Sequence, residues 1–220
     1  MTRKQPSKLD TIRRHGKTQV QAQRNSILDA AEKLFLERGL ENTSMKDIAA
    51  KAGITRMSLY RYFPDRDPIV FEIAVRMLRR ICYAAEIGEQ PINLEFFRKA
   101  IIQMIDEFFS LRDAFRYISM FDHLYGAHYP NEQLASWFKE QIFELGWGAI
   151  IAEAGRNDVI PVQAAMIGNS TMSFLEKMAV RGDLMAGEQD VPLADQLTFY
   201  KDMVNDYFNK MERESKERMQ

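Results

Sequence analysis

The chain has 220 residues, a formal net charge of −1, and 46 % hydrophobic and 28 % charged residues. That length suits one large domain or two small ones, and the composition excludes an intrinsically disordered chain. The single cysteine, Cys82, excludes an internal disulfide framework and any multi-cysteine zinc or iron–sulfur site. No apolar run reaches the roughly 18 residues that a membrane-spanning helix needs. We therefore expect a cytoplasmic protein without membrane contact.

The near-zero net charge conceals an uneven distribution along the chain. Residues 1–66 contain 14 basic and 7 acidic side chains, a net of +7, whereas residues 67–220 contain 16 and 24, a net of −8. This break indicates a small basic module joined to a larger acidic one. The basic module has the charge that would attract nucleic acid, although the whole chain does not.

The basic module begins with a segment that has no apolar core of its own. Residues 1–20 are polar, with six basic side chains against one acidic side chain, which predicts a flexible basic arm. Apolar side chains at helical spacing then predict a helix from about residue 22, which ends at Gly39, where a left-handed C-terminal cap is favoured.

Two short helices are predicted next, over residues 44–52 and 55–62, with a turn at Gly53 between them. Ser44, which is followed by Asp47 in a capping-box pattern, and Thr55 have hydroxyl groups suited to helix N-caps. A glycine in the turn, small residues where the helices cross and an apolar inner face are required for a helix-turn-helix. The outward face of the second helix carries side chains that can read base edges or grip phosphate: Arg56, Met57, Ser58, Tyr60 and Arg61. The pattern alone leaves open a three-helix bundle with a solvated polar face.

The acidic region is also predicted to be helical, because helical periodicity continues and no strand alternation or hairpin signal occurs. The expected helices cover about residues 66–85, 93–111, 113–125, 131–155, 158–182 and 192–211. With the first three they make an all-α chain of about nine helices, and residues 215–220 are expected to be a frayed charged tail.

Three runs in the basic module resemble the DNA-binding domain of the tetracycline-repressor (TetR) family. They are Asn25 to Gly39, Thr43 to Ile54 and Ser58 to Arg66, and the resemblance covers about residues 22–70. The helix spacings, the Ala-Gly turn and the Leu-Tyr-Arg-Tyr-Phe run with a basic residue after it carry the resemblance. It implies a helix-turn-helix domain over residues 21–66 and a homodimeric transcriptional regulator, most often a repressor, that binds a palindromic double-stranded DNA operator.

The resemblance also assigns roles by position. Arg56 is the first candidate for a base contact, since arginine is the commonest bidentate reader of guanine, and a phosphate contact is the alternative. Met57 departs from the small residue common there and suits a thymine methyl group. Tyr60 and Arg66 match positions that contact phosphate. The expected DNA-binding residues are Ser44, Lys46, Thr55, Arg56, Met57, Ser58, Tyr60, Arg61 and Arg66. The arm over residues 1–20 either lies in the adjacent minor groove or remains solvated.

The resemblance implies that residues 67–214 form a domain that dimerises and binds a small-molecule effector. An apolar stripe in the last helix, and small residues in the helix before it, fit a two-fold four-helix interface; ordinary core helices of a monomer are the alternative. The expected interface residues are Ala165, Gly168, Met172, Leu197, Tyr200 and Val204.

The effector is unidentified, but the many aromatic and methionine side chains of this region favour a lipophilic or aromatic molecule. From where family pockets lie, the expected lining is Met104, Phe108, Phe121, Trp147, Met166 and Asn169. We expect no cofactor and no metal site, because His123 and His128 lie five residues apart and do not share a helix face.

No nucleophile–base pair, paired carboxylates, phosphate-binding loop or metal-ligand set occurs, so we do not expect an enzyme. The alternative function is a DNA-bound structural protein. Its acidic helical domain would recruit a protein partner and would need no small-molecule inducer.

Overall fold

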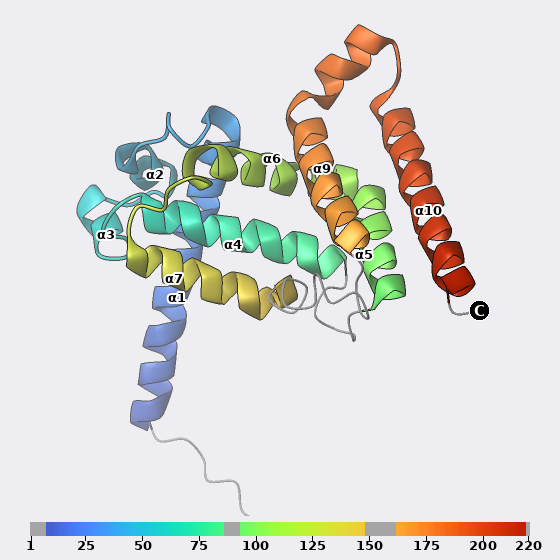
Figure 1. Cartoon of the computed structure of the whole chain (residues 1–220). Helices are drawn as coiled ribbons and strands as arrows, with labels where there is room; N and C mark the ends of the chain where they lie inside the picture. Colours follow the sequence, from blue (N-terminus) through green and yellow to red (C-terminus); the bar gives the residue numbers. More distant parts are fainter. Residues whose placement is uncertain (1–7, 86–92, 148–161, 219–220) are drawn as a thin grey trace, which may run out of the picture. The chain divides into compact units, whose positions relative to one another are not determined.

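The computed structural model describes residues 8–85, 93–147 and 162–218, and these residues form helices without any β-strand (Figure 1). The predicted all-α fold is therefore confirmed. The chain divides into two compact units, Met1–Ile73 and Ala74–Gln220, and the boundary falls inside a helix. No helix among the described residues is both long enough and apolar enough to cross a membrane.

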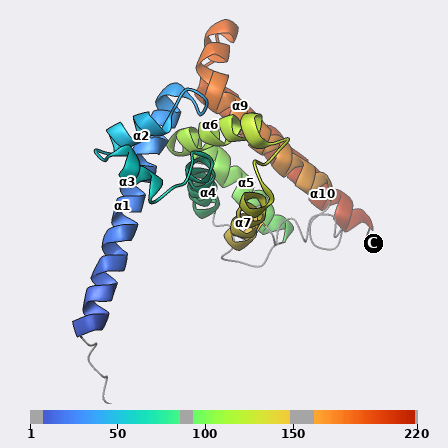
Figure 2. The ribbon, with the colours of Figure 1, turned by 90° about the vertical axis from the view of Figure 1, so that its left-hand side faces the viewer.

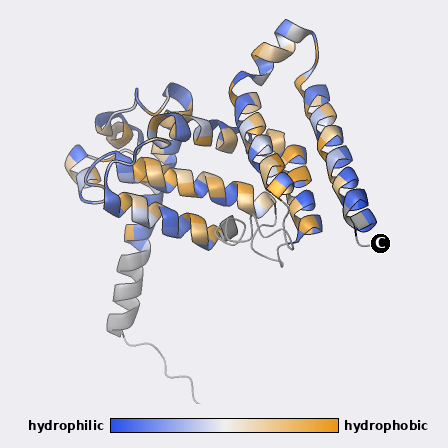
Figure 3. Cartoon of the chain, viewed as in Figure 1, coloured by the Kyte–Doolittle hydropathy of each residue, from blue (hydrophilic) through white to orange (hydrophobic). Residues whose placement is uncertain are grey.

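The first unit contains α1 (Lys8–Arg38), α2 (Met45–Lys51), α3 (Arg56–Tyr60) and the start of α4 (Asp67–Ala84). Its core forms where apolar faces of these helices meet, because burial of such faces stabilises helices that are too short to persist alone. The fully buried large side chains of this core include Ile27, Phe35, Ile48, Leu59, Phe63 and Phe71. Figure 3 shows that α4 is apolar along much of its length, in agreement with its many buried residues.

The predicted helix ends and caps of the first unit are confirmed. Gly39 ends α1 with a φ of 86°, and Gly53 turns the chain between α2 and α3 with a φ of 67°, values that favour glycine. The capping box between Ser44 and Asp47 is formed, and its hydrogen bonds lower the pKa of the Asp47 carboxyl group. Thr55 caps α3 by accepting a hydrogen bond from the backbone N–H of Ser58 at 3.1 Å.

The predicted arm is helical from Lys8 onward, so the flexible segment expected over residues 1–20 is wrong for its larger part. Residues 8–20 include four lysine or arginine residues and one glutamine, which are good helix formers. A helix that is already nucleated by buried residues further along α1 can extend through such a stretch, because each added residue gains a hydrogen bond. Residues 1–7 lie outside the described part of the chain.

The second unit continues α4 and adds the remaining helices. They are α5 (Leu94–Asp106), α6 (Phe108–Tyr125), α7 (Glu132–Ile142), the π-helical turn η1 (Phe143–Trp147), α9 (Val162–Gln189) and α10 (Leu193–Arg218). Asn93 and Asn131 cap α5 and α7, as their position in the sequence predicts.

Three boundaries in the second unit differ from the prediction. The break between α5 and α6 falls at Glu107, which is not a helix breaker and therefore left no signal in the sequence. The helix α9 continues past Gly182, because that glycine makes room for Leu193: an added Cβ would lie 2.9 Å from a Leu193 methyl group. The helix α10 extends to Arg218, through most of the tail that was expected to fray. Residues 148–161, in which one predicted helix ends and the next begins, lie outside the described residues.

The helix α9 packs against α6, α5 and α10, and it runs antiparallel beside α10 (Figure 1). The ring of Phe174 on α9 stacks on the ring of Tyr200 on α10, with 3.9 Å between their centroids. Ion pairs also connect these helices. Arg112 Nη2 on α6 lies 2.6 Å from Asp183 Oδ2 on α9, and Lys201 Nζ on α10 lies 2.6 Å from Asp106 Oδ1 on α5.

The closest approach of α5 to α9 depends on Gly168. An added Cβ there would lie 2.7 Å from Cζ of the buried Phe97 ring. We expect Gly168→Ala to destabilise the fold by about 1–3 kcal/mol, because a rigid ring must be displaced in a packed core. Urea unfolding followed by circular dichroism measures the change.

Gly187→Ala is the matched control on the same helix, since an added Cβ there meets nothing within 4 Å. It should be neutral or stabilising by about 0.5–1 kcal/mol, the gain from replacing glycine inside a helix. Equal effects of the two substitutions would contradict the proposed close packing.

Candidate nucleic-acid interface

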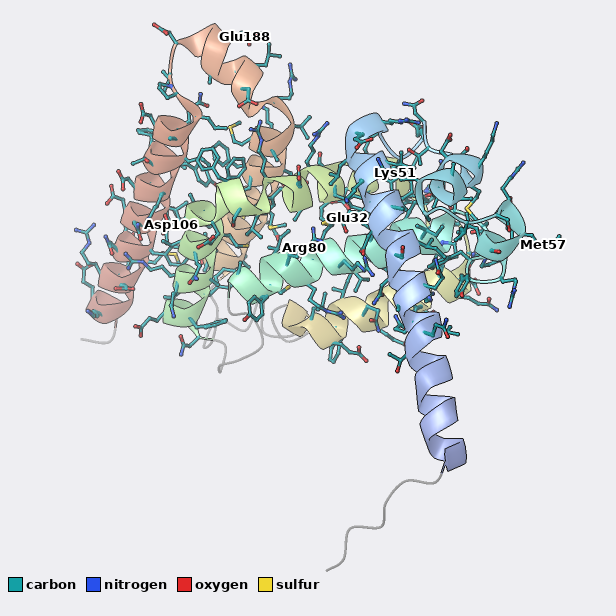
Figure 4. All side chains as sticks on the ribbon, turned by 180° about the vertical axis from the view of Figure 1, so that it is seen from behind. Glu32, Lys51, Met57, Arg80, Asp106 and Glu188 are labelled. Carbon is teal, nitrogen blue, oxygen red and sulfur yellow. The ribbon has the colours of Figure 1, made fainter. Side chains whose placement is uncertain are left out.

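The helix α3 presents Leu59 inward, whereas its outward side chains are cationic or polar apart from Met57. Leu59 is fully buried, whereas Met57 and Tyr60 are 79 % and 47 % exposed. Arg56 and Arg61 are exposed as well, and Figure 4 shows Met57 pointing away from the helices of the first unit. The predicted reading face is therefore brought together on the surface, where side chains can reach base edges or phosphates.

The hydroxyl groups expected to contact DNA also form hydrogen bonds within the protein. Those of Ser44 and Thr55 cap α2 and α3, and the Thr55 hydroxyl lies 2.9 Å from that of Ser58. Thr43 is buried and donates a hydrogen bond to the Gly39 carbonyl at 3.0 Å, so its role is structural. Lys46 is exposed beside this cap.

Arg66, which was expected to contact a DNA phosphate, is half-buried and forms a hydrogen bond to a distant part of the first unit. Its Nη1 donates a hydrogen bond to the carbonyl oxygen of Leu40 at 2.8 Å. A guanidinium has five N–H donors, so this bond leaves others for phosphate. The position predicted from the sequence therefore has a structural role that sequence reasoning missed.

Sequence reasoning also missed the attachment of α1 to α4. Arg24 on α1 forms a two-nitrogen ion pair with both carboxylate oxygens of Glu72 on α4. The guanidinium carbon of Arg24 lies 4.1 Å from the centroid of the Phe63 ring, a cation–π distance. Arg24 and Glu72 are 48 residues apart, so no local pattern marks their contact.

Comparison with known proteins agrees with this geometry. Residues 27–73 match the family model of bacterial regulatory proteins, tetR family. This segment of the chain is therefore a tetR-family domain.

Two relatives show how far the sequence similarity extends. The HTH-type transcriptional regulator TtgR of Pseudomonas putida is 30 % identical over 97 residues, which are 43 % of this chain and 46 % of that protein. The HTH-type transcriptional repressor KstR2 of Rhodococcus jostii is 48 % identical over 50 residues, or 23 % of this chain and 24 % of that protein. The chain spans about half the length of the curated relatives that it matches.

Solved TetR-family structures share the fold over most of the chain. A regulator from Marinobacter aquaeolei has a TM-score of 0.56 at 16 % identity and covers 84 % of this chain and 97 % of its own. The regulator PfmR from Thermus thermophilus has a TM-score of 0.51 at 22 % identity, and the match covers 81 % of this chain and 96 % of that protein. At these identities the likeness shows the fold alone.

The residues expected to line an effector pocket do not share one environment. Met104, Phe108 and Phe121 are buried, and the rings of Phe108 and Phe121 pack against neighbouring aromatic rings. Met166 is 63 % exposed and Asn169 is exposed on α9, while the side chain of Trp147 lies outside the described part. A groove of about 1040 Å³ between α5 and α10 has a different and mostly polar lining that includes Arg98 and Gln103.

The residues expected at the dimer interface pack largely within their own chain. Leu197 and Val204 are buried, Tyr200 stacks on Phe174, and Gly168 makes room for Phe97. Ala165 and Met172 are half-buried. A second face of the same two helices is apolar and exposed: it consists of Met166, Val180 and Leu184 on α9 and Phe199, Met203 and Tyr207 on α10.

Two carboxyl groups meet where α6 packs on α9. Burial, and then the nearby charge of Asp122, raise the pKa of the half-buried Glu176 from 4.5 to about 7. Asp122 is exposed as a residue, but partial burial of its carboxyl group raises the pKa of that group too. Both shifts favour the protonated form in the folded state.

The raised pKa of Glu176 predicts a pH dependence of stability. Between pH 4.5 and about 7 the folded state binds more protons at this group than the unfolded state does. The contribution of Glu176 therefore falls as the pH rises through this range, by about 1–2 kcal/mol after allowance for solvent screening. Urea unfolding of the wild type and of Glu176→Gln at pH 5 and pH 8 measures it.

The wild type should lose stability relative to Glu176→Gln on going from pH 5 to pH 8. Glu140→Gln, which neutralises an exposed carboxylate on α7, is the control and should follow the wild type at both pH values. A constant difference between the wild type and Glu176→Gln would show that the carboxyl group titrates normally.

Proposed function

We propose that the chain is a homodimeric transcriptional regulator, acting as a repressor, that binds a palindromic operator in double-stranded DNA. The observation that carries the proposal is the outward face of α3. Arg56, Met57, Tyr60 and Arg61 are exposed there, while Leu59 anchors the helix in the core. Arginine reads guanine, a methionine can contact a thymine methyl group, and a tyrosine hydroxyl can bond phosphate.

The charge distribution supports this assignment. Residues 1–66 carry a net charge of +7, and residues 67–220 carry −8. Such a distribution attracts the basic part to the phosphates and repels the acidic part, so it favours one orientation of approach.

Dimerisation is part of the proposal because a helix-turn-helix reads two half-sites about 34–36 Å apart, which one copy cannot span. The exposed apolar face of α9 and α10 supports it. On α10, Phe199, Met203 and Tyr207 recur every four residues and so lie on one face. Three exposed large apolar side chains in a row on one helix are typical of a surface that a partner covers.

We further propose that a small lipophilic or aromatic effector binds the second unit and releases the operator. This part is supported by the family resemblance and by the aromatic interior around Phe108 and Phe121. The effector would act by binding better to a dimer whose recognition helices are wrongly spaced. A 100-fold preference corresponds to about 2.7 kcal/mol of coupling.

The DNA-binding assignment predicts different effects of two substitutions on α3. Arg56→Ala should weaken binding by about 1–3 kcal/mol and relax sequence preference, because it removes a base contact. Tyr60→Phe should weaken binding equally for all sequences, because it removes a phosphate contact. Fluorescence anisotropy at fixed salt, with duplexes selected by the wild type from a random-sequence pool, measures both.

Lys139→Ala is the charge-matched control for Arg56→Ala, since Lys139 is exposed on α7, outside the first unit. It should bind the selected duplex as the wild type does. If Arg56→Ala and Tyr60→Phe also bind unchanged, α3 is not the recognition helix.

The dimer assignment predicts that two acidic substitutions on α10 separate the protomers. Phe199→Asp with Met203→Asp places charges on the exposed apolar face without touching the buried face of the helix. Sedimentation velocity at micromolar concentration should then show a folded monomer, because burying two unpaired carboxylates opposes association.

Tyr83→Asp is the control, since Tyr83 on α4 is 80 % exposed and outside α9 and α10. It should sediment as the wild type does. A double variant that still sediments as a dimer would place the interface elsewhere.

A further inference from the structure

We propose that Met57 on α3 is an oxidation site, at which a peroxide converts the thioether into a sulfoxide and thereby weakens operator binding. The inference rests on the proposed DNA binding by α3 and adds a chemical input to it. With hydrogen peroxide, the O–O bond breaks, one oxygen atom forms a bond to the Met57 sulfur, and water is released. The sulfur is oxidised by two electrons and the peroxide is reduced by two.

The first observation is the exposure of the Met57 side chain. It is 79 % exposed, and Figure 4 shows it pointing away from the helices of the first unit. Figures 1 and 2 both show α3 at the outer surface of that unit, beside α2. A thioether has no proton to lose, so its oxidation depends on access of the oxidant and not on a pKa. A peroxide in solution therefore reaches the Met57 sulfur without any movement of the fold.

The second observation is the placement of the other methionines. Met166 and Met203 are 63 % and 49 % exposed, but both lie on the apolar face of α9 and α10 that we propose is covered by a second copy. The remaining methionines in the described ranges are buried or half-buried. In the proposed dimer, Met57 is therefore the most accessible methionine of the described part of the chain.

The third observation is the chemistry of the proposed contact. The apolar end of a methionine can contact the methyl group of thymine. A sulfoxide is polar, and its oxygen needs a hydrogen-bond donor when water is removed. The methyl group has no hydrogen to donate, and the neighbouring O4 of thymine is itself an acceptor. Oxidation thus replaces a favourable apolar contact by an unsatisfied polar group.

The same contact makes oxidation depend on whether DNA is bound. A base that packs against the Met57 side chain excludes the oxidant from its sulfur. The free protein is therefore the form that is oxidised, and the sulfoxide then opposes its return to the operator. Methionine sulfoxide is reduced enzymatically to the thioether, so the change is reversible.

The test begins with a variant that keeps the apolar contact but cannot be oxidised at this position. Met57→Leu replaces the thioether by an apolar side chain of similar volume. The full-length wild type and the variant are treated with hydrogen peroxide, and fluorescence anisotropy measures binding to a duplex that the wild type selects from a random-sequence pool. The treated wild type should bind about tenfold more weakly or worse, because one lost base contact lowers affinity by roughly 5- to 150-fold.

The treated Met57→Leu variant should bind as it does before treatment. It retains Met166 and Met203, so a loss of binding caused by damage to the dimer face would appear in it as well. Met120→Leu, which removes a half-buried methionine on α6, is the matched control and should remain as sensitive as the wild type. If peptide mass spectrometry finds the sulfoxide at Met57 while wild-type binding is unchanged, the proposal is wrong.

Enzymatic reversal separates the sulfoxide from other damage. Methionine sulfoxide reductases, one for each epimer of the sulfoxide, should restore binding of the treated wild type. Cys82 is buried, and the oxidised forms of a cysteine are not substrates of these enzymes. If Met57 returns to the thioether and binding does not recover, another lesion caused the loss, against the proposal.

Protection by DNA gives the last test. The selected duplex should slow oxidation of Met57, as measured by peptide mass spectrometry, whereas an unselected duplex at a salt concentration that prevents its binding should not. Equal rates would show that bound DNA does not cover this side chain, which would overturn the proposal. If the wild type selects no duplex at all, the proposed function fails first; if it selects one and binds it unchanged after oxidation of Met57, only this inference fails.

Discussion

The attachment of α1 to α4 through Arg24 is the interaction on which the proposed DNA-binding surface depends. The helix α3, which we propose as the recognition helix, has five residues and one buried side chain within them, Leu59, so it cannot be stable by itself. The residues that come directly after α3 in the chain hold it in position. Phe63 is fully buried, and the guanidinium of Arg24 lies over its ring while binding Glu72. Loss of Glu72 would leave the half-buried guanidinium of Arg24 without this partner, which costs more than the pair itself contributes.

The same contact fixes how α1 is rotated within the first unit. Because the guanidinium of Arg24 lies over Phe63 and pairs with Glu72, one side chain links the position of α3 to the start of α4.

Interactions between residues close together in the sequence could be predicted in the first unit. Interactions between residues far apart in the sequence could not. Gly39, the Ser44–Asp47 capping box and Thr55 act within four residues, so sequence spacing alone identifies them. The contact between Arg24 and Glu72 joins positions 48 residues apart, and the bond from Arg66 to Leu40 joins positions 26 residues apart. Only the folded chain brings these groups together. The start of α1 at Lys8 was missed for another reason, since a basic stretch with few apolar residues resembles a coil in composition although its lysine and arginine residues favour helix.

The helix α10 shows why an apolar pattern alone cannot assign a partner. Its stripe contains two faces. Leu197, Val204 and Phe208 are buried against the rest of their own chain, while Phe199, Met203 and Tyr207 are exposed. Periodicity detects the buried face first, because a core helix needs it, and the predicted dimer residues came from that face. Gly168 is a second example, because it was predicted to allow close approach of a second copy. Its lack of a side chain does permit close helix approach, but the helix that approaches is α5 of the same chain. A candidate surface for a second copy can be identified only after the residues that are buried within the chain itself have been excluded.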